Sequence, residues 1–303
     1  MTSLEKYKQL IHWGTSTWTF PEWAGIVYHR PYTQKNIKAE SLAEYAAFPS
    51  FSTVGIDHTF YAPPNPFVLL EYAKFLPAGF KCVSKVWEEI TVPQWNQHRR
   101  YGKKAGKANP NFLDVEKFKT EIVAVYEKAF KDHTGPFVFE FGEMYPPAMP
   151  SLEIYLEKLD AFLGKLSEGC RYAVEIRNKG FLQPDYFATL KRHKVAPVFN
   201  HWTKMPRLKD QLAVAGDSLR ATGFAIVRLL TPRGIKYDAA KELYEPYNSI
   251  KVRNAEMRDD LEELIRWAIE HNVELYILVN NKAEGCAPLT IQEMDQQLQE
   301  NLK

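Results

Sequence analysis

Short apolar segments alternate along the chain with longer amphipathic segments, and this alternation predicts the fold. Several short segments are apolar at consecutive positions, as in Phe137-Val138-Phe139 and Tyr276-Ile277-Leu278-Val279. Such runs are typical of parallel strands that are buried on both faces. The predicted strands are 10–14, 52–56, 80–85, 137–141, 172–176, 195–199, 224–230 and 274–279.

The amphipathic segments between these strands predict helices. In one of them, Leu261, Leu264, Ile265 and Ala268 recur at helical spacing and give a single apolar face. Proline fits a first helical turn and aspartate fits a helix start; such residues are Pro66, Pro150, Pro184, Asp114 and Asp259. The predicted helices are 40–48, 66–76, 113–131, 150–166, 184–192, 209–216, 258–270 and 288–300.

Eight strand–helix pairs in 303 residues indicate a single (β/α)8 TIM-like barrel domain spanning 1–303. The helix-to-strand connections are short, whereas three strand-to-helix connections are long, after strands 1, 3 and 7, at about 15–39, 86–112 and 231–257. In such a barrel all strand-to-helix loops share one rim, and that rim carries the active site. An open doubly wound sheet is the alternative, but no G-x-G-x-x-G turn follows an early strand.

Composition narrows the class of protein. The net charge of +2 provides no strong field for nucleic acid or membrane, and 45% hydrophobic residues exclude global disorder. No apolar run is long enough to span a bilayer, and the N-terminal segment has no apolar core of a signal peptide. Three widely spaced cysteines support neither a disulfide framework nor a C-x-x-C site. We therefore expect a reduced, cytoplasmic protein with no membrane partner.

Motifs spread over about 14–288 resemble those of the DUF72 (YecE-like) family. They are Gly14-Thr15-Ser16-Thr17-Trp18 with Trp23, Gly25 and Tyr28; Asp57-His58-Thr59-Phe60-Tyr61 with Pro64; Phe80 to Lys85 with Thr91; Glu175-Ile176-Arg177; Val227-Arg228-Leu229; and Asn280-Asn281 with Gly285, Ala287 and Pro288. The resemblance implies a TIM-like barrel, but the family has no established activity. The chain departs from the family pattern at Asp57-His58, where Glu-Asn is usual, and this indicates a ligand different from that of typical members.

Charged and polar residues gather at the predicted strand ends. They are Ser16, Asp57, His58, Lys85, Glu140, Glu175, Arg177, Asn200, His201, Arg228, Asn280 and Asn281. Burying unpaired charges is costly, so one interpretation is a structural ion network. The other is a site, because an apolar layer would stabilise a barrel core better. On that interpretation Ser16, Asp57, Lys85, Glu175, Arg177, Arg228, Asn280 and Asn281 line one concave pocket.

Within this set, Glu175 pairs with Glu140 or Asp57 as an acid and base, since two carboxylates in one pocket separate their pKa values. Glu140 alternates with Phe139 and Phe141 and could instead point outward into the helix layer. Lys85, Arg177 and Arg228 form a cationic set that suits a carboxylate or phosphate.

A divalent metal on Asp57, His58, Glu175 and His201 is a weaker hypothesis, because the histidines lack H-x-H or H-E-x-x-H spacing. The cofactor is therefore left unknown.

Two loop features add alternatives. Trp18 and its aromatic neighbours in the first long loop, with Tyr61 in the second, form either a hydrophobic cluster or a stacking platform for a sugar or base. The loop 98–107 carries six basic or histidine side chains with no acid from 90 to 113; it is a solvated loop, a lid over an anionic ligand, or a phosphate-backbone contact.

The sequence thus favours an enzyme, of hydrolase or lyase/isomerase type, acting on a small anionic or polyhydroxylated ligand at the C-terminal rim. Glu175, Asp57 and Lys85 are the catalytic candidates. The ligand-binding candidates are Ser16, Trp18, His58, Tyr61, Arg177, Asn200, His201, Arg228, Asn280 and Asn281. The alternative is a non-catalytic nucleic-acid or nucleotide-binding protein that uses loop 98–107 and the loop aromatics.

Overall fold

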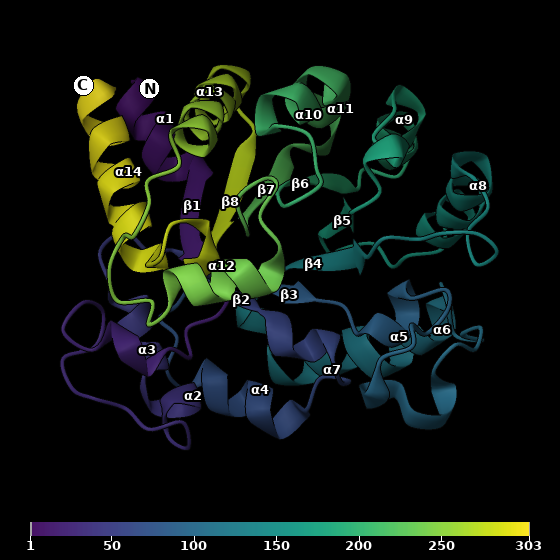
Figure 1. The fold of residues 1–303 in the computed structure, drawn as a ribbon, viewed down its shortest axis with the longest axis horizontal. Coiled ribbons are helices and arrows are strands. Elements are labelled where there is room, and N and C mark those ends of the chain that lie inside the picture. Colours follow the sequence, from purple (N-terminus) through teal and green to yellow (C-terminus); the bar gives the residue numbers. More distant parts are fainter. Residues whose placement is uncertain (1, 303) are drawn as a thin grey trace.

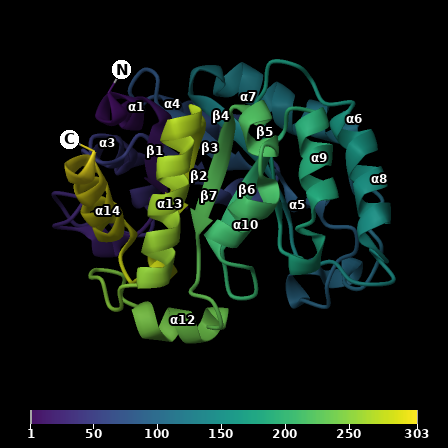
Figure 2. The ribbon, with the colours of Figure 1, turned by 90° about the horizontal axis from the view of Figure 1, so that it is seen from above.

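Eight parallel strands form a nearly closed barrel, and helices surround it (Figures 1 and 2). The structure is a computed structural model that describes residues 2–302, apart from the side chain of Ala39. The strands are β1 (Ile11–Thr15), β2 (Thr53–Ile56), β3 (Lys81–Lys85), β4 (Thr134–Phe141), β5 (Tyr172–Ile176), β6 (Ala196–His201), β7 (Phe224–Leu229) and β8 (Glu274–Val279). Their order, β1-β8-β7-β6-β5-β4-β3-β2, confirms the predicted (β/α)8 barrel and excludes the open doubly wound sheet.

The helices follow the predicted alternation, with additions. They are α1 (Ser3–Leu10), α2 (Ile37–Glu40), α3 (Leu42–Ala46), α4 (Pro66–Ala73), α5 (Glu88–Thr91), α6 (Val115–Phe118), α7 (Ala124–Ala129), α8 (Leu152–Leu163), α9 (Pro184–Arg192), α10 (Leu208–Ala215), α11 (Ser218–Thr222), α12 (Tyr237–Tyr244), α13 (Ala255–His271) and α14 (Ala287–Asn301). A π-helical turn, Lys119–Val123, joins α6 to α7. Each predicted helix has a counterpart, whereas α1, α5, α11, α12 and all but the last residue of α2 were not predicted.

Alternate residues of each strand face either the barrel interior or the helix layer, because side chains alternate along a strand. The interior packs mostly small and branched side chains, with two aromatic rings, in one cluster made of Val83, Val138, Ala173, Ala196, Val198, Phe224, Ile226, Tyr276 and Leu278. Their strand neighbours, such as Phe137 and Phe139, belong to the larger cluster under the helices. The interior cluster ends before the carboxyl ends of the strands, where polar residues replace it.

The barrel closes between β1 and β2 by close approach of their backbones. Ser52 N donates to Trp13 O at 2.9 Å, but no regular ladder joins these two strands. A Cβ on Gly14 would lie 2.1 Å from the carbonyl oxygen of Thr53, and a Cβ on Gly55 would lie 2.6 Å from that of Ser16. Glycine at both positions therefore lets the seam close.

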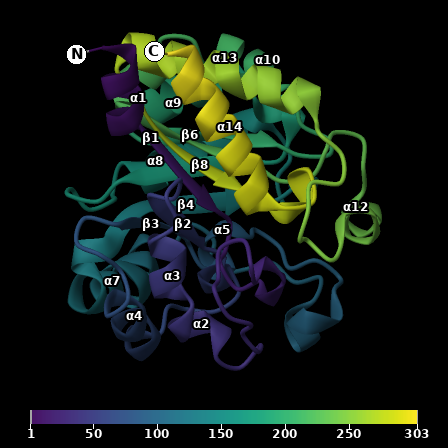
Figure 3. The same cartoon turned by 90° about the vertical axis from the view of Figure 1, so that its left-hand side faces the viewer.

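The chain ends lie side by side, because α1 packs next to α14 (Figures 1 and 3). Helix α1 begins with a capping box, in which the Thr2 and Glu5 side chains each accept from the other's backbone N–H. Tyr7 Oη donates to Asp295 Oδ1 at 2.6 Å and fixes α1 against α14.

The carboxyl ends of the strands carry the long loops, as predicted, after β1, β3 and β7. The loop after β7 contains α12, which Figure 3 shows beyond the tip of β8. None of the helices formed by residues 2–302 combines the length and hydropathy needed to cross a bilayer.

Candidate functional site

Six charged side chains meet inside the carboxyl end of the barrel. They come from β3, β4, β5 and β7 and from the turns after β2 and β5, and we call them the ionic cluster: Asp57, Lys85, Glu140, Glu175, Arg177 and Arg228. The cluster contains three cations and three carboxylates, so its formal charge is zero.

Arg228 joins all three carboxylates. Its Nη1 lies 2.7 Å from Glu140 Oε2 and 2.5 Å from Glu175 Oε2, and its Nη2 lies 3.0 Å from Asp57 Oδ2. The side chains of Arg228 and Glu175 are 2% and 0% exposed, so the centre of the cluster is dry. Burial removes the hydration of each charge. Removing one partner would therefore leave the remaining charges buried and uncompensated.

Two further cations complete the cluster. Lys85 Nζ lies 2.8 Å from Glu140 Oε2 and 3.2 Å from Asp57 Oδ2. Arg177 Nη2 lies 2.9 Å from Glu140 Oε1, and its Nε donates to Glu175 Oε1 at 3.2 Å. Burial opposes ionisation of Glu140, but Arg177, Lys85 and Arg228 outweigh it and hold its pKa well below its ordinary value.

Glu140 therefore points into the barrel and not into the helix layer. Its register partner across the β4–β5 ladder is Glu175, which places the two carboxylates at one height. Phe139 and Phe141 take the outward positions on either side of it. The structure resolves the alternative that the sequence left open for this residue.

Polar atoms without partners lie near the carboxyl ends of β1, β6, β7 and β8. Within residues 2–302 the buried atoms Ser16 Oγ, Asn200 Oδ1, Arg228 Nε and Asn281 Nδ2 make no hydrogen bond. Asn200 and Arg228 are neighbours in the β6–β7 register. Asn280 is different, because its Oδ1 accepts from Lys282 N and caps the turn after β8.

The two histidine candidates lie apart from the ionic cluster. His201 is buried, and its Nε2 lies 3.2 Å from Asn254 Nδ2, while burial lowers its pKa to about 4. His58 is exposed, and its Nε2 lies 3.2 Å from the Tyr72 hydroxyl. No three histidine, cysteine, aspartate or glutamate side chains of residues 2–302 are placed to hold a metal ion, so the hypothesised four-residue metal set does not assemble.

The two aromatic candidates differ in accessibility. Trp18 is 1% exposed, its indole N–H donates to Lys38 O, and its ring packs edge-on against Tyr72. Tyr61 is 60% exposed and lies under the Arg100 guanidinium, 5.0 Å from the ring centre. Of the two rings, Tyr61 is the one that a ligand can reach.

Loop 98–107 is attached to the short helix α5. Arg100 Nη2 lies 2.7 Å from Glu88 Oε2, and Lys104 Nζ lies 3.0 Å from Glu89 Oε2. Both carboxylates are 7% exposed. Glu88 and Glu89 lie just before the acid-free stretch 90–113. The basic side chains of the loop therefore have no acidic partner within that stretch of the sequence.

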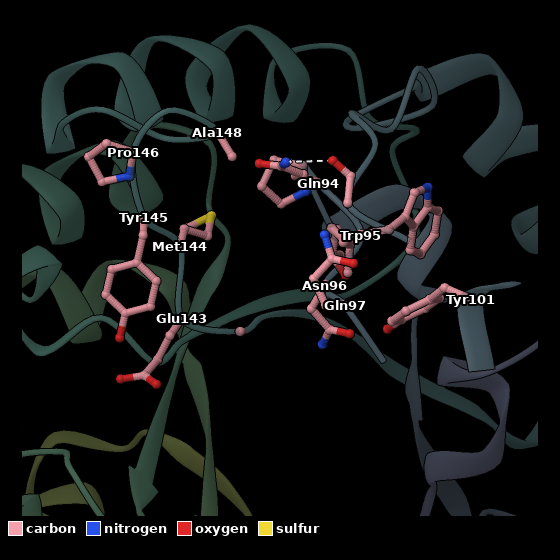
Figure 4. A pocket seen from close by; sticks show the side chains of 15 residues that line it. Gln94, Trp95, Asn96, Gln97, Tyr101, Glu143, Met144, Tyr145, Pro146 and Ala148 are labelled. Carbon is pink, nitrogen blue, oxygen red and sulfur yellow. Dashed lines mark hydrogen bonds between the residues drawn. The ribbon is translucent and has the colours of Figure 1, made fainter. Parts of the chain in front are cut away.

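Two cavities open at the same rim. The first, about 590 Å³, lies between loop 91–106 and the loop after β4 (Figure 4). The second, about 510 Å³, is lined by the loops after β4, β5 and β6. Glu143 and Tyr145 belong to both linings, so the cavities adjoin. Of the eight residues expected to line one pocket, Arg177 alone lines either of these cavities.

Sequence reasoning missed most of the cavity lining. The first cavity presents Gln94, Trp95, Asn96 and Gln97 on one side, opposite Glu143 and Tyr145 (Figure 4). These residues stand in loops and not at strand ends, so strand periodicity gave no signal for them. The one available signal was their place in strand-to-helix loops, which a barrel gathers at one rim.

Comparison with known proteins agrees with this fold. A family model described as "Protein of unknown function DUF72" matches residues 12–303. A DUF72 family protein from Thermotoga maritima MSB8 is similar with a TM-score of 0.63 and 19% identity, over 95% of this chain and 99% of that one. A DUF72 family protein from Enterococcus faecalis V583 is similar with a TM-score of 0.62 and 16% identity, over 97% of this chain and 98% of that one. At these identities the structural likeness concerns the fold alone, and no curated protein matches the chain.

Proposed function

This chain belongs to the DUF72 family, and from that premise we propose that it is an enzyme that binds a small polyhydroxylated or anionic ligand at the carboxyl rim of its barrel. The observation that carries the proposal is the ionic cluster at the strand ends. Replacing a buried ion network with apolar side chains is often neutral or stabilising, so stability alone is a poor reason for six charges there. Barrel enzymes place their active sites at this rim.

The charge balance of the cluster favours a ligand rich in hydroxyl groups. Because three cations already face three carboxylates, the cluster offers donors and acceptors without excess charge. At the more exposed edge of the cluster, Lys85 Nζ supplies a donor and Asp57 Oδ2 an acceptor, 3.2 Å apart. A hydroxyl group both donates and accepts, so it suits such a pair.

Accessibility assigns the roles within the proposal. Asp57 is the most exposed carboxylate of the cluster, at 24%, and is the proposed general base. Lys85, at 10%, is the proposed donor to oxygen atoms that gain charge in the reaction. Glu175 is fully buried and accepts from both arginines, so we assign it a positioning role and no longer the acid–base role.

The test compares the protein with an Asp57→Asn variant on a metabolite mixture followed by mass spectrometry. Asparagine keeps the shape of the side chain but cannot take a proton. We expect one compound to be consumed by the unchanged protein and bound without turnover by the variant. Asp259→Asn, on the surface of α13, is the control and should keep the activity. Equal consumption by all three proteins, or none by any, contradicts the proposal.

The nucleic-acid alternative has less support from the geometry. Two basic side chains of loop 98–107, Arg100 and Lys104, are paired with Glu88 and Glu89. Exposed cations remain at Arg99, Lys103 and Lys107. Binding of an oligonucleotide that weakens steeply with salt, and that is lost when these three are neutralised, would favour this alternative.

A further inference from the structure

Three of the nine residues that line the second rim cavity are cations. Its charged residues are Arg177, Lys179, Lys204 and Glu143, so three positive side chains face one carboxylate. They come from three successive loops, after β4, β5 and β6, which the barrel brings to one place. An anion bound in this cavity is attracted by its excess of positive side chains.

Arg177 is fixed in place with one nitrogen free. Its Nε and Nη2 are held by Glu175 and Glu140, and its guanidinium lies 5.0 Å from the centre of the Trp202 ring. Within residues 2–302, its Nη1 forms no hydrogen bond or ion pair. The side chain is 19% exposed and lines the cavity. A guanidinium held in this way loses little conformational freedom when it binds an oxyanion.

Of the two lysines, Lys179 supplies the excess charge, because Lys204 is paired. Lys204 Nζ contacts both carboxylate oxygens of Glu143, at 2.9 and 2.8 Å. Lys179 is exposed and has no carboxylate within ion-pair distance among the residues that the structure describes. An anion in the cavity therefore meets one uncompensated ammonium group and the free edge of Arg177.

The adjoining cavity has the opposite character. Apart from the shared Glu143, its lining carries no charged side chain, but it carries the amides of Gln94, Asn96 and Gln97 and the ring of Tyr145 (Figure 4). Tyr145 is 57% exposed, and Figure 4 shows it projecting from the loop after β4. Amides bond to hydroxyl groups and an open aromatic ring packs against the C–H face of a sugar.

We infer that the cavity of Arg177, Lys179 and Lys204 binds the anionic group, a carboxylate or a phosphate, of a ligand whose hydroxylated body lies in the adjoining cavity. The ligand class is then an acidic or phosphorylated sugar. The inference that the ligand has a hydroxylated body rests on the proposed function. The inference of an anion site rests on the charged side chains that line its cavity.

The first experiment isolates the anion site. Inorganic phosphate is titrated into the protein by calorimetry at constant ionic strength, with chloride as the balancing salt, because screening alone also changes charge repulsion. We expect saturable binding. A Lys179→Gln variant should weaken it about three- to fivefold, the scale of an exposed charge pair. Lys158→Gln, an exposed lysine of α8, is the matched control and should leave the affinity unchanged.

The second experiment identifies the ligand class. Hexoses and pentoses are compared with the same sugars carrying a terminal carboxylate or a terminal phosphate. We expect one acidic series to bind at least tenfold more tightly than the neutral sugars, and the Lys179→Gln, Lys204→Gln double variant should abolish that gain. The acidic series that binds more tightly than the neutral sugars identifies the anionic group as carboxylate or phosphate.

The outcomes separate this inference from the proposed function. Neutral sugars that bind as well as both acidic series, with no saturable phosphate binding, overturn the anion site and leave the proposed function standing. Phosphate binding that depends on Lys179, with no sugar bound in any series, supports the anion site and contradicts the hydroxylated ligand. Phosphate binding that both lysine variants leave intact overturns the inference.

Discussion

At the scale of single residues, Arg228 has the largest structural consequence, because it neutralises three carboxylates at once. Arg228→Met keeps the apolar stem but leaves Asp57, Glu140 and Glu175 with two cations. We expect the free energy of unfolding to fall by about 3–5 kcal/mol, as when a buried ion pair loses one partner. Urea denaturation at neutral pH measures this change.

Arg177→Met provides the comparison for that prediction. Arg177 contacts two of the same carboxylates but is 19% exposed, so water can replace part of its contribution. Its loss should destabilise the protein less than the loss of Arg228. Equal effects of the two substitutions would show that the burial of Arg228 does not govern the energetics of the cluster.

His201 gives a prediction about pH at the residue scale. Burial lowers its pKa to about 4 in the folded protein, from an ordinary value of 6.5. Between these two values the unfolded chain binds a proton that the folded protein does not, so stability falls as the pH falls from about 6.5 to about 4.

His201→Asn should flatten this part of the stability–pH curve, measured by urea denaturation at a series of pH values. The slope, and not the stability at a single pH, is the informative quantity, because the smaller side chain also loses packing. A slope that the substitution leaves unchanged would mean that the imidazole takes up its proton without cost in the folded protein.

The sequence identified individual residues unevenly. Five of the six members of the ionic cluster were expected in one site, because they stand at predicted strand ends. The direction of Glu140 could not be predicted, since every residue of 136–141 is buried and the polarity pattern shows no face. The partners of loop 98–107 were missed because Glu88 and Glu89 lie in a short helix with no periodic signal.

At the scale of elements, the seam between β1 and β2 depends on two glycines. In Gly14→Ala, the new Cβ would lie 2.1 Å from a backbone oxygen, a contact that no rotamer change can relieve. We expect a loss of at least 1–3 kcal/mol in the free energy of unfolding, the usual cost of overpacking. Gly180→Ala is the control, because a Cβ there meets no atom within 4 Å.

Element boundaries were predicted best where the pattern was strongest. Strands β5 and β8 and helix α9 have the predicted ends, whereas α1 was missed although Thr2 and Glu5 have the spacing of a capping box. Helix α13 begins earlier than predicted, with Asn254 and not Asp259 at its start. Pro150 precedes the cap Ser151 and does not occupy the first turn of α8.

At the scale of the whole molecule, an ion pair network closes the amino end of the barrel. Glu274 on β8 lies 2.6 Å from Arg171 and 2.9 Å from His12. Burial opposes the ionisation of Glu274, but its contacts with His12 and Arg171 prevail and lower its pKa to about 2. The pairing thus joins β8 to β1 and to the segment before β5.

This network predicts a second step of acid destabilisation. A carboxyl group with a lowered pKa stabilises the fold above its ordinary value of 4.5, and that contribution is lost as the pH falls from about 4.5 to about 2. Glu274→Gln should make the protein less stable at neutral pH and less sensitive to acid in that window. Parallel acid-unfolding curves for the two proteins would contradict the prediction.

The fold as a whole was predictable because strand burial, loop lengths and family motifs all indicated the same barrel. The cavities were not, since their shape depends on how loops of different strands pack against one another. Arg177 illustrates the difference: its place at a strand end is evident from the sequence, but its free nitrogen in a cavity follows only from the side chains around it.

The pairing of β1 also has a consequence for synthesis on the ribosome. Its regular ladder partner is β8, some 260 residues later, while β2 offers it little more than a single backbone hydrogen bond. As the nascent chain emerges, residues 11–15 therefore remain without a strand partner until residues 275–279 have left the exit tunnel. During that interval β1 presents unpaired N–H and C=O groups, and unpaired strand edges of this kind favour aggregation.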